Sequence, residues 1–324
     1  MILAPPTFSL RQLQYAVAVA ESMSFRKAAE RCHVSQPSLS AQLAQLEDAL
    51  GVRLFERDRR RVLLTAAGKE LVERARRVLI DVDDLVSSAR HQSDPLVGQL
   101  NIGVIPTISP YLLPEVAPAI RSEFPRLTVL WTEDKTDVLV RSLDTGLLDA
   151  ALLALEADIG DVEREVIARD EFVLAAPPGH RLAARKSPVA LSELRGESLL
   201  LLDDGHCLRE QALAFCSSAR VRELEFRATS LSTLVQMVAA DAGITLLPRL
   251  AVATEVRRAE LRLRPFANPV PHRTIALVWR RQAARVEALR RVAATILAAY
   301  PRDAAASKPP AGKPGRKRAG VAAG

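Results

Sequence analysis

The segment Phe25–Glu47, FRKAAERCHVSQPSLSAQLAQLE, decides the fold of the first part of this 324-residue chain. A helix is expected over Phe25–Arg31, and a second helix is expected to begin after Ser35, whose hydroxyl can cap it. Pro37 falls in the first turn of that second helix, where a missing N–H costs nothing. Only the short turn Cys32–Val34 separates the two helices, so the segment predicts a tight helical pair.

Polar side chains gather at the start of the second helix. Helix, short turn and helix, with polar residues at that position, is the helix-turn-helix arrangement. Such side chains suit contacts with base edges and phosphates. The alternative is an ordinary helical hairpin with a solvated polar face. The candidate DNA-binding residues of this helix are Ser35, Gln36, Pro37, Ser38, Ser40 and Gln42.

A basic segment, Val52–Thr65, follows at once with the sequence VRLFERDRRRVLLT. Two short β-like runs flank Glu56–Arg61, which predicts a hairpin, or wing, that reaches the phosphate backbone. A run of charge is usually just a solvated loop, but this one follows a candidate recognition helix. The wing residues that we assign to DNA are Arg57, Arg59, Arg60 and Arg61.

A long helix is expected over Ala66–Gln92, with an apolar stripe at 3.5-residue spacing. A stripe so long and narrow suits pairing with a second copy of the chain better than covering a compact core. Its members are Leu71, Ala75, Val78, Val82, Leu85 and Ala89.

The net charge of +7 is concentrated at the two ends of the chain. Residues 1–66 carry nine Lys/Arg against six Asp/Glu, and residues 302–324 carry six against one. A basic head on a nearly neutral body suggests a nucleic-acid-binding module attached to a body that is not one. The low aromatic content of 4% disfavours base-stacking platforms for single strands.

The composition also bears on location. No apolar run reaches the ~18 residues of a membrane helix, and no signal peptide is evident at the start of the sequence. Three cysteines without such a signal favour a reducing cytoplasm, with no membrane partner.

Beyond a short linker, residues 100–300 alternate between strand-like and helix-like patterns, from the strand Leu100–Val104 to the amphipathic helix Val286–Tyr300. The alternation predicts an α/β body with parallel sheets. We divide the chain into a DNA-binding domain (1–66), a linker helix and hinge (67–96), a regulatory domain (97–300) and a disordered basic tail (301–324). Within the regulatory domain, lobe I takes residues 97–168 and 273–300, and lobe II takes residues 169–268.

The pair of helices and the sequence FERDRRRVLLTAAG after it closely resemble the DNA-binding domain of the LysR-type transcriptional regulators. The resemblance extends from residue 8 to about residue 300. It implies an all-α winged helix-turn-helix domain with a long linker helix, followed by an α/β two-lobed regulatory domain like a periplasmic binding protein. It also implies double-stranded operator DNA and RNA polymerase as partners, and self-association as a dimer of dimers.

Two of the three cysteines, Cys207 and Cys216, stand nine positions apart in LDDGHCLREQALAFCS, residues 202–217. Leu208–Phe215 consists of good helix formers. Nine helical residues advance the chain by roughly 14 Å and rotate it by roughly 900°, half a turn out of register. Since a disulfide needs Cα atoms within about 7 Å, the thiols are either reduced and helical or bonded and refolded.

Other interpretations of these cysteines stay open. A buried cysteine is most often a small inert hydrophobe. His206, Cys207 and Cys216 could be metal ligands, but structural zinc needs four and the spacing is not CxxC; we expect no metal and no cofactor. Cys207 would lie at a helix N-terminus, which favours a thiolate, whereas Cys216 follows Phe215 on an apolar patch. This predicts one attacking and one resolving thiol.

The stretch Asp203–Cys216 is similar to the redox loop of the hydrogen-peroxide-sensing activators within the LysR-type family. By that resemblance, Cys207 is the peroxidatic cysteine and Cys216 the resolving cysteine. The resemblance also implies that the peroxide site is lined by Thr107, Thr136, His206 and Arg273. Thr107 also follows a strand and precedes a helix, where α/β folds place ligands.

The sequence therefore predicts a cytoplasmic transcription regulator that senses peroxide through a reversible disulfide, and not an enzyme. A LysR-type regulator of a small metabolite, with bystander cysteines, is one competitor. A thiol peroxidase is another, and the winged helix-turn-helix argues against it.

Overall fold

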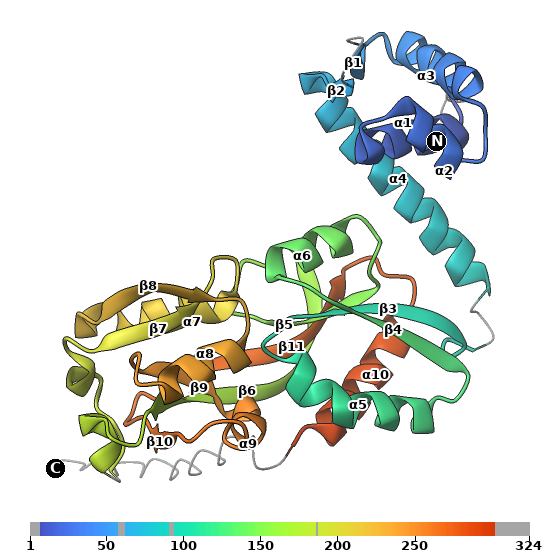
Figure 1. Cartoon of the computed structure of the whole chain (residues 1–324). Helices are drawn as coiled ribbons and strands as arrows, with labels where there is room; N and C mark the ends of the chain where they lie inside the picture. The colour runs from blue at the N-terminus through green and yellow to red at the C-terminus, as the bar shows by residue number, and fades with distance from the viewer. Residues whose placement is uncertain (1–6, 58–61, 91–93, 186, 302–324) are drawn as a thin grey trace, which may run out of the picture. The chain divides into compact units, whose positions relative to one another are not determined.

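The computed structural model describes residues 7–57, 62–90, 94–185 and 187–301 (Figure 1). The chain forms two compact units. The first comprises Met1–Ile167, Asp204–Leu208 and Ile275–Ala299, and the second comprises Ala168–Asp203, Arg209–Thr274 and Tyr300–Gly324. The predicted disordered tail lies outside the described residues from residue 302 onward.

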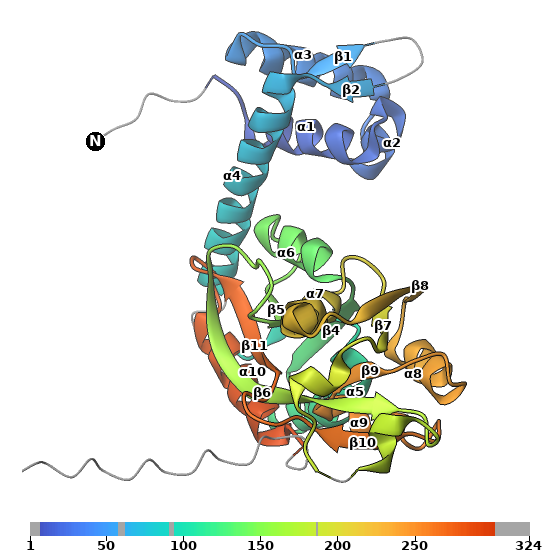
Figure 2. The same ribbon diagram turned by 90° about the vertical axis from the view of Figure 1, so that its left-hand side faces the viewer.

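The first unit opens with three helices and a hairpin (Figure 2). The helices are α1 (Leu10–Ser22), α2 (Phe25–Arg31) and α3 (Gln36–Leu50), and strand β1 (Phe55–Arg57) pairs antiparallel with β2 (Val62–Leu64). This confirms the winged helix-turn-helix prediction. The shared core includes Leu13, Val19, Ala28, Leu39, Leu43, Leu46, Leu54 and Phe55.

Serine caps fix where these helices begin. The hydroxyl oxygens of Ser9, Ser24 and Ser35 each accept the backbone N–H three residues later, at the first turn of α1, α2 and α3. Helix α3 ends at Gly51, whose φ of +69° is a left-handed conformation that favours glycine. Local sequence therefore sets the boundaries of the helix-turn-helix.

Helix α4 (Ala66–Arg90) follows the hairpin. Gly68 is required near its start because a Cβ there would lie 2.0 Å from the carbonyl oxygen of Leu54. Along the predicted apolar stripe, Ala75 is buried against the helical core, whereas Val78 and Leu85 are exposed. The pairing of this stripe with a second copy stays a prediction.

The rest of the first unit is an α/β layer that positions the candidate site. Strand β3 (Gly98–Val104) lies parallel to both β4 (Leu127–Glu133) and β5 (Ala150–Ala154). Helices α5 (Ser109–Glu123) and α10 (Val286–Ala299) pack side by side (Figure 1), and the Thr295 hydroxyl donates to the Glu123 carboxylate at 2.7 Å. Helix α6 (Thr136–Asp144) follows β4.

The prediction of parallel sheets is confirmed for β3, β4 and β5 but wrong for other strands of the same sheet. Strand β11 (His272–Arg280) pairs antiparallel with β5 because the chain enters it from the second unit. Strand β6 (Val162–Ala176) begins in the first unit, and its end, residues 172–176 of the second unit, pairs antiparallel with both β9 (Thr245–Pro248) and β10 (Arg262–Pro265). Strand β6 begins at Val162, in a stretch too charged to read as a buried strand.

A second, two-stranded sheet in this unit carries the cysteine segment. Strands β7 (Ser198–Leu202) and β8 (Arg222–Ala228) are parallel, and α7 (Cys207–Cys216) with the 3₁₀ turn Ser217–Ala219 connects them. Helices α8 (Leu231–Ala239) and α9 (Arg249–Glu255) follow.

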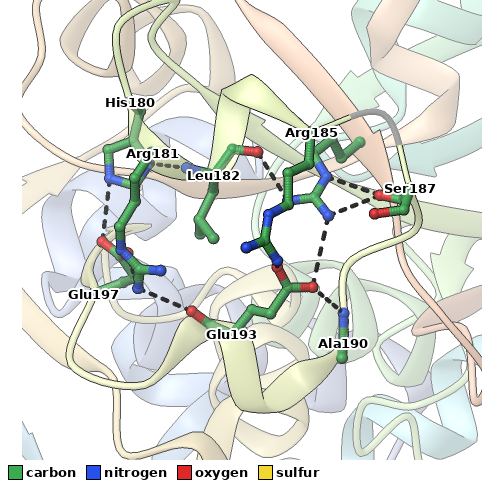
Figure 3. Close-up of polar contacts among 9 residues, drawn as sticks. His180, Arg181, Leu182, Arg185, Ser187, Ala190, Glu193 and Glu197 are labelled. Atoms are coloured by element: carbon green, nitrogen blue, oxygen red, sulfur yellow. Dashed lines mark hydrogen bonds and ion pairs between the residues drawn. The ribbon is translucent and has the colours of Figure 1, made fainter.

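A buried arginine, Arg264, braces the irregular segments 177–185 and 187–197 of the second unit, which contain the 3₁₀ helices Arg181–Ala184 and Leu191–Leu194 (Figure 3). Arg264 donates to the carbonyl of Leu182 at 2.8 Å and to that of Ser187 at 2.7 and 2.9 Å. The Glu193 carboxylate accepts the Ala190 N–H at 2.9 Å and lies 3.6 Å from Arg264. A buried arginine thus satisfies carbonyls that no regular element would satisfy.

Glu193 gives this brace a pH dependence. The hydrogen bond from the Ala190 N–H, helped by the charges of Arg264 and Arg185, lowers the pKa of Glu193 below its ordinary value of 4.5. Because the folded pKa is the lower one, the carboxylate stabilises the fold above the ordinary pKa, and this contribution is lost as pH falls through the folded pKa. We expect Glu193→Gln to cost on the order of 1 kcal/mol at pH 7, and this cost should shrink as the pH falls below 4.5 and through the folded pKa.

Urea unfolding at several pH values checks this, with Glu260→Gln, at a largely exposed glutamate, as the matched control. A loss of stability for Glu193→Gln that does not shrink as the pH is lowered from 7 through 4.5 would contradict the assignment.

Candidate functional site

The two cysteines are the first and last residues of one helix. Helix α7 starts at Cys207 and ends at Cys216, and both side chains are buried. All three cysteines of the chain are thiols, with no disulfide among them. Across ten helical residues the two Cα atoms are about 14 Å apart and face opposite sides of the helix. The structure therefore holds the reduced, helical arrangement that the spacing predicts.

The two thiols occupy different environments. Cys207 stands at the N-terminus of α7, where the helix dipole and unpaired N–H groups favour negative charge. Cys216 is only 1% exposed, and burial raises its pKa from 9.0 to about 11. At neutral pH Cys216 is accordingly a protonated, sheltered thiol.

The loop that leads to Cys207 is held by a lysine of the same unit. Residues 203–206 connect the end of β7 to the start of α7. The Lys135 ammonium donates to the carbonyl oxygen of Asp204 at 2.6 Å. Gly205 has a φ of +86°, and a Cβ there would lie 3.0 Å from Cδ of Lys135. His206, next to Cys207, is buried.

Thr107 and Thr136 occupy equivalent positions after two neighbouring strands. The last residues of β3 and β4, Val104 and Glu133, are register partners, and each threonine comes three residues later. Parallel strands end at one edge of a sheet, so both threonines follow the carboxyl edge where α/β folds bind ligands. Both are buried, and the Thr136 hydroxyl oxygen has no hydrogen-bond partner among the described residues.

Four of the predicted site residues therefore belong to one compact unit, namely Thr107, Thr136, His206 and Cys207. The hydrogen bond from Lys135 to Asp204 joins the start of α6, where Thr136 lies, to the loop that contains His206 and leads to Cys207.

Arg273 belongs to the second unit. Its guanidinium Nε and Nη2 both lie 2.9 Å from Oδ2 of Asp170, and both residues are fully buried. Oδ1 of Asp170 accepts the Leu250 N–H at 3.0 Å. Burial raises the pKa of Asp170, and the adjacent Arg273 charge opposes that rise. The assignment of Arg273 to a peroxide site stays a prediction.

Sequence reasoning missed one candidate, Gln211. It lies four residues after Cys207 on α7, which places it on the same face of the helix one turn away. Its amide nitrogen and oxygen are both buried, and neither has a hydrogen-bond partner among the described residues. The i,i+4 spacing from Cys207 was the available signal, but only the structure reveals the unsatisfied amide.

Helix α7 is anchored to its two-stranded sheet by Arg209. The guanidinium donates to the Glu223 carboxylate on β8 at 2.5 Å and to the Leu202 carbonyl on β7 at 3.4 Å. Unfolding of α7 around Arg209 would therefore cost this ion pair, whose arginine is buried and whose glutamate is exposed, as well as helical hydrogen bonds.

The candidate DNA-binding face lies at the start of α3. Ser35, Gln36, Pro37 and Ser38 are exposed, while Ser40 and Gln42 are partly buried. The Ser35 hydroxyl accepts the Ser38 N–H at 3.3 Å, so Ser35 acts as a helix cap whatever else it contacts. The predicted wing residues Arg59, Arg60 and Arg61 lie outside the described residues, as does the side chain of Arg57.

No cluster of three or more His, Cys, Asp or Glu side chains among the described residues is arranged to hold a metal ion. No described helix combines the length and apolar character needed to cross a membrane.

Family models match most of the chain. Residues 10–69 match the bacterial regulatory helix-turn-helix protein of the lysR family, and residues 93–301 match the LysR substrate binding domain. The chain belongs to the LysR family. Among its members, the DNA-binding transcriptional dual regulator OxyR of Escherichia coli K12 is 48% identical over 273 residues, covering 84% of this chain and 89% of that protein.

Solved structures of the LysR family point to the same relatives. A full-length OxyR from Pseudomonas aeruginosa with a cysteine-to-aspartate substitution is similar with a TM-score of 0.73 and 36% identity, covering 89% of this chain and 94% of that one. A cysteine-to-serine OxyR from Corynebacterium glutamicum, with H₂O₂ bound, is similar with a TM-score of 0.62 and 34% identity, covering 92% and 93%. Within the family, the chain is thus OxyR-like.

The difference between the two thiols is directly testable. In a Cys32→Ser background, we expect the single thiol of a Cys207→Ser variant to react slowly with iodoacetamide at pH 8, because Cys216 is buried and its pKa is raised to about 11. The rate should keep rising up to about that pH, since only the thiolate reacts.

The matched Cys216→Ser variant, in which Cys207 is the only thiol, should react faster at pH 8. Equal rates, or a Cys216 rate that levels off below pH 9, would contradict the assigned environments.

Proposed function

We propose that this LysR-family protein is an OxyR-like activator of oxidative-stress genes that senses hydrogen peroxide through a reversible Cys207–Cys216 disulfide. The observation that carries the proposal is the reduced cysteine pair at opposite ends of α7. One thiol starts the helix in the unit that holds Thr107 and Thr136, and the other is sheltered in the second unit.

The chemistry proceeds in two balanced steps. The Cys207 thiolate attacks one oxygen of H₂O₂, the O–O bond breaks, and the departing hydroxide takes up a proton to leave as water, which produces a sulfenic acid. The Cys216 sulfur then attacks the Cys207 sulfur, the S–O bond breaks, and a second water leaves as the disulfide forms. Peroxide is reduced to two waters, and the two thiols supply the electrons.

The peroxide site is proposed to comprise Thr107, Thr136, His206 and Arg273, as the resemblance implies. Hydroxyl and guanidinium groups can orient H₂O₂ against the thiolate and stabilise the departing oxygen. The Thr136 hydroxyl supports this assignment, because buried polar atoms without a hydrogen-bond partner among the described residues are uncommon.

Because the two cysteines cannot bond across an intact α7, disulfide formation must unfold that helix. We propose that this refolding re-docks subunits of a dimer of dimers and so changes DNA contacts and the response of RNA polymerase. The exposed part of the α4 stripe supports self-association.

Operator DNA is read by the exposed start of α3 in the major groove, with the basic wing on the phosphate backbone. The protein acts in the cytoplasm, where its cysteines stay reduced until peroxide arrives. In this proposal the DNA-binding domain ends at residue 66, the linker helix and hinge end at residue 96, and the regulatory domain ends at residue 300.

The first test maps the thiols before and after one equivalent of H₂O₂. We expect an intramolecular Cys207–Cys216 disulfide and a free Cys32, because Cys32 lies in the helix-turn-helix without a second cysteine nearby in sequence. A Cys216→Ser variant should retain a sulfenic acid at Cys207 that dimedone traps, and Cys207→Ser should not respond.

Pairing through Cys32 or only intermolecular links would contradict the disulfide. A regulator of a small metabolite would show no change in DNA binding with peroxide alone, and a thiol peroxidase would turn over many equivalents with a reductant.

The DNA-binding assignment makes a separate prediction. Gln36→Ala and Ser38→Ala should weaken specific binding more than non-specific binding, because they face base edges. Arg59→Ala and Arg60→Ala should weaken both and reduce the salt dependence by about one unit of slope per lost phosphate contact. Footprinting over a salt series, with deletion of residues 301–324 as control, measures this.

Deletion of the tail should leave sequence preference intact. A footprint that disappears with the tail but survives Gln36→Ala and Ser38→Ala would overturn the placement of the reading helix.

A further inference from the structure

Lys135 stands where two parts of the proposed peroxide site meet. It is the residue before α6, so it is bonded directly to Thr136. Its ammonium group donates to the carbonyl oxygen of Asp204, 69 positions later in the chain, at 2.6 Å. Asp204 lies three residues before Cys207, and all of these residues belong to the first compact unit.

Besides this hydrogen bond, the Lys135 side chain also makes a packing contact with the loop. The aliphatic stem of Lys135 packs over Gly205, where a Cβ would lie 3.0 Å from Cδ and 3.5 Å from Nζ. Gly205 also adopts a left-handed φ of +86°. The loop backbone is therefore shaped to receive this side chain, and a charged donor makes a stronger hydrogen bond to a carbonyl than a neutral one does.

The side chain of Lys135 is not needed for the start of α6. It makes no capping hydrogen bond to that helix, whose first turn is satisfied through the Lys135 carbonyl. Lys135 is also only partly buried. Removing its ammonium group should leave the fold intact. An effect of that change on the reaction of Cys207 would then not be due to unfolding.

We propose that Lys135 is a positioning residue for the reaction of Cys207 with peroxide. It fixes the loop before Cys207 relative to Thr136, and so sets the thiol against the hydroxyl that orients H₂O₂. The inference rests on the proposed function. Displacements of about 1 Å cost up to about 10²-fold in rate when reacting groups must be aligned, whereas a reagent that needs no orientation loses little.

The experiment uses the full chain with Cys32→Ser and Cys216→Ser, so that Cys207 is the only thiol and its sulfenic acid accumulates. Second-order rates are measured with H₂O₂ and, in parallel, with iodoacetamide over a range of pH. Lys135→Met keeps the stem and removes the donor, and Lys135→Arg restores a charged donor. Lys69→Met, at an exposed lysine on α4, is the matched control.

We expect Lys135→Met to slow the peroxide reaction at least about tenfold, with the iodoacetamide rate and its pH profile nearly unchanged. Lys135→Arg should recover most of the loss, and Lys69→Met should have no effect. Thr136→Val should also slow the peroxide reaction, since the proposed function places that hydroxyl on H₂O₂.

The other outcomes contradict the positioning role of Lys135, and they differ in whether they also contradict the proposed function. If Thr136→Val slows peroxide but Lys135→Met does not, the positioning role is wrong and the proposed function stands. If neither changes the rate, the proposed peroxide pocket falls as well. If both reagents slow in parallel in Lys135→Met and arginine does not restore them, Lys135 serves only to hold the loop folded.

Discussion

The length of one helix governs this regulator. With Cys207 at the first residue of α7 and Cys216 at the last, the two sulfurs are separated by about 14 Å of helix and by half a turn. A disulfide tolerates Cα atoms no more than about 7 Å apart. The helix and the bond are mutually exclusive, so oxidation of the thiols must be a conformational change and not a local chemical mark.

The surroundings of α7 determine how that exclusion is used. Burial keeps Cys216 protonated, so it does not compete with Cys207 for peroxide. The ion pair of Arg209 with Glu223 stabilises the helical state, and its loss adds to the cost of unfolding. The reduced state is thus held by packing and charge, while the covalent bond would hold the other state. A two-state element of this kind is what a switch requires.

The sequence predicted the helix-turn-helix well because serine caps, the first-turn proline and the terminal glycine are local signals. The incompatibility between the helix and a Cys207–Cys216 disulfide was equally predictable, since it follows from the nine-residue spacing of the two cysteines. Strand direction was not, because an apolar run such as that of β11 marks a strand without saying which way the chain enters it. The start of β6 was hidden by its charged, half-exposed residues.

Contacts between residues far apart in the chain could not be predicted from the sequence either. Asp170 pairs with Arg273 from 103 positions away, and Lys135 reaches Asp204 across 69. The unsatisfied amide of Gln211 is a property of burial, so its spacing from Cys207 alone did not single it out. The candidate site was therefore predicted by resemblance, and the contacts that hold it came from the structure.

The central claim is that α7 cannot survive disulfide formation. Hydrogen–deuterium exchange of the peptide that spans residues 207–216, compared between the reduced protein and protein oxidised with one equivalent of H₂O₂, tests it most directly. We predict slow amide exchange in the reduced protein and loss of that protection on oxidation, with the β3–β4 region unchanged. A fully formed Cys207–Cys216 disulfide with undiminished protection across α7 would contradict the account.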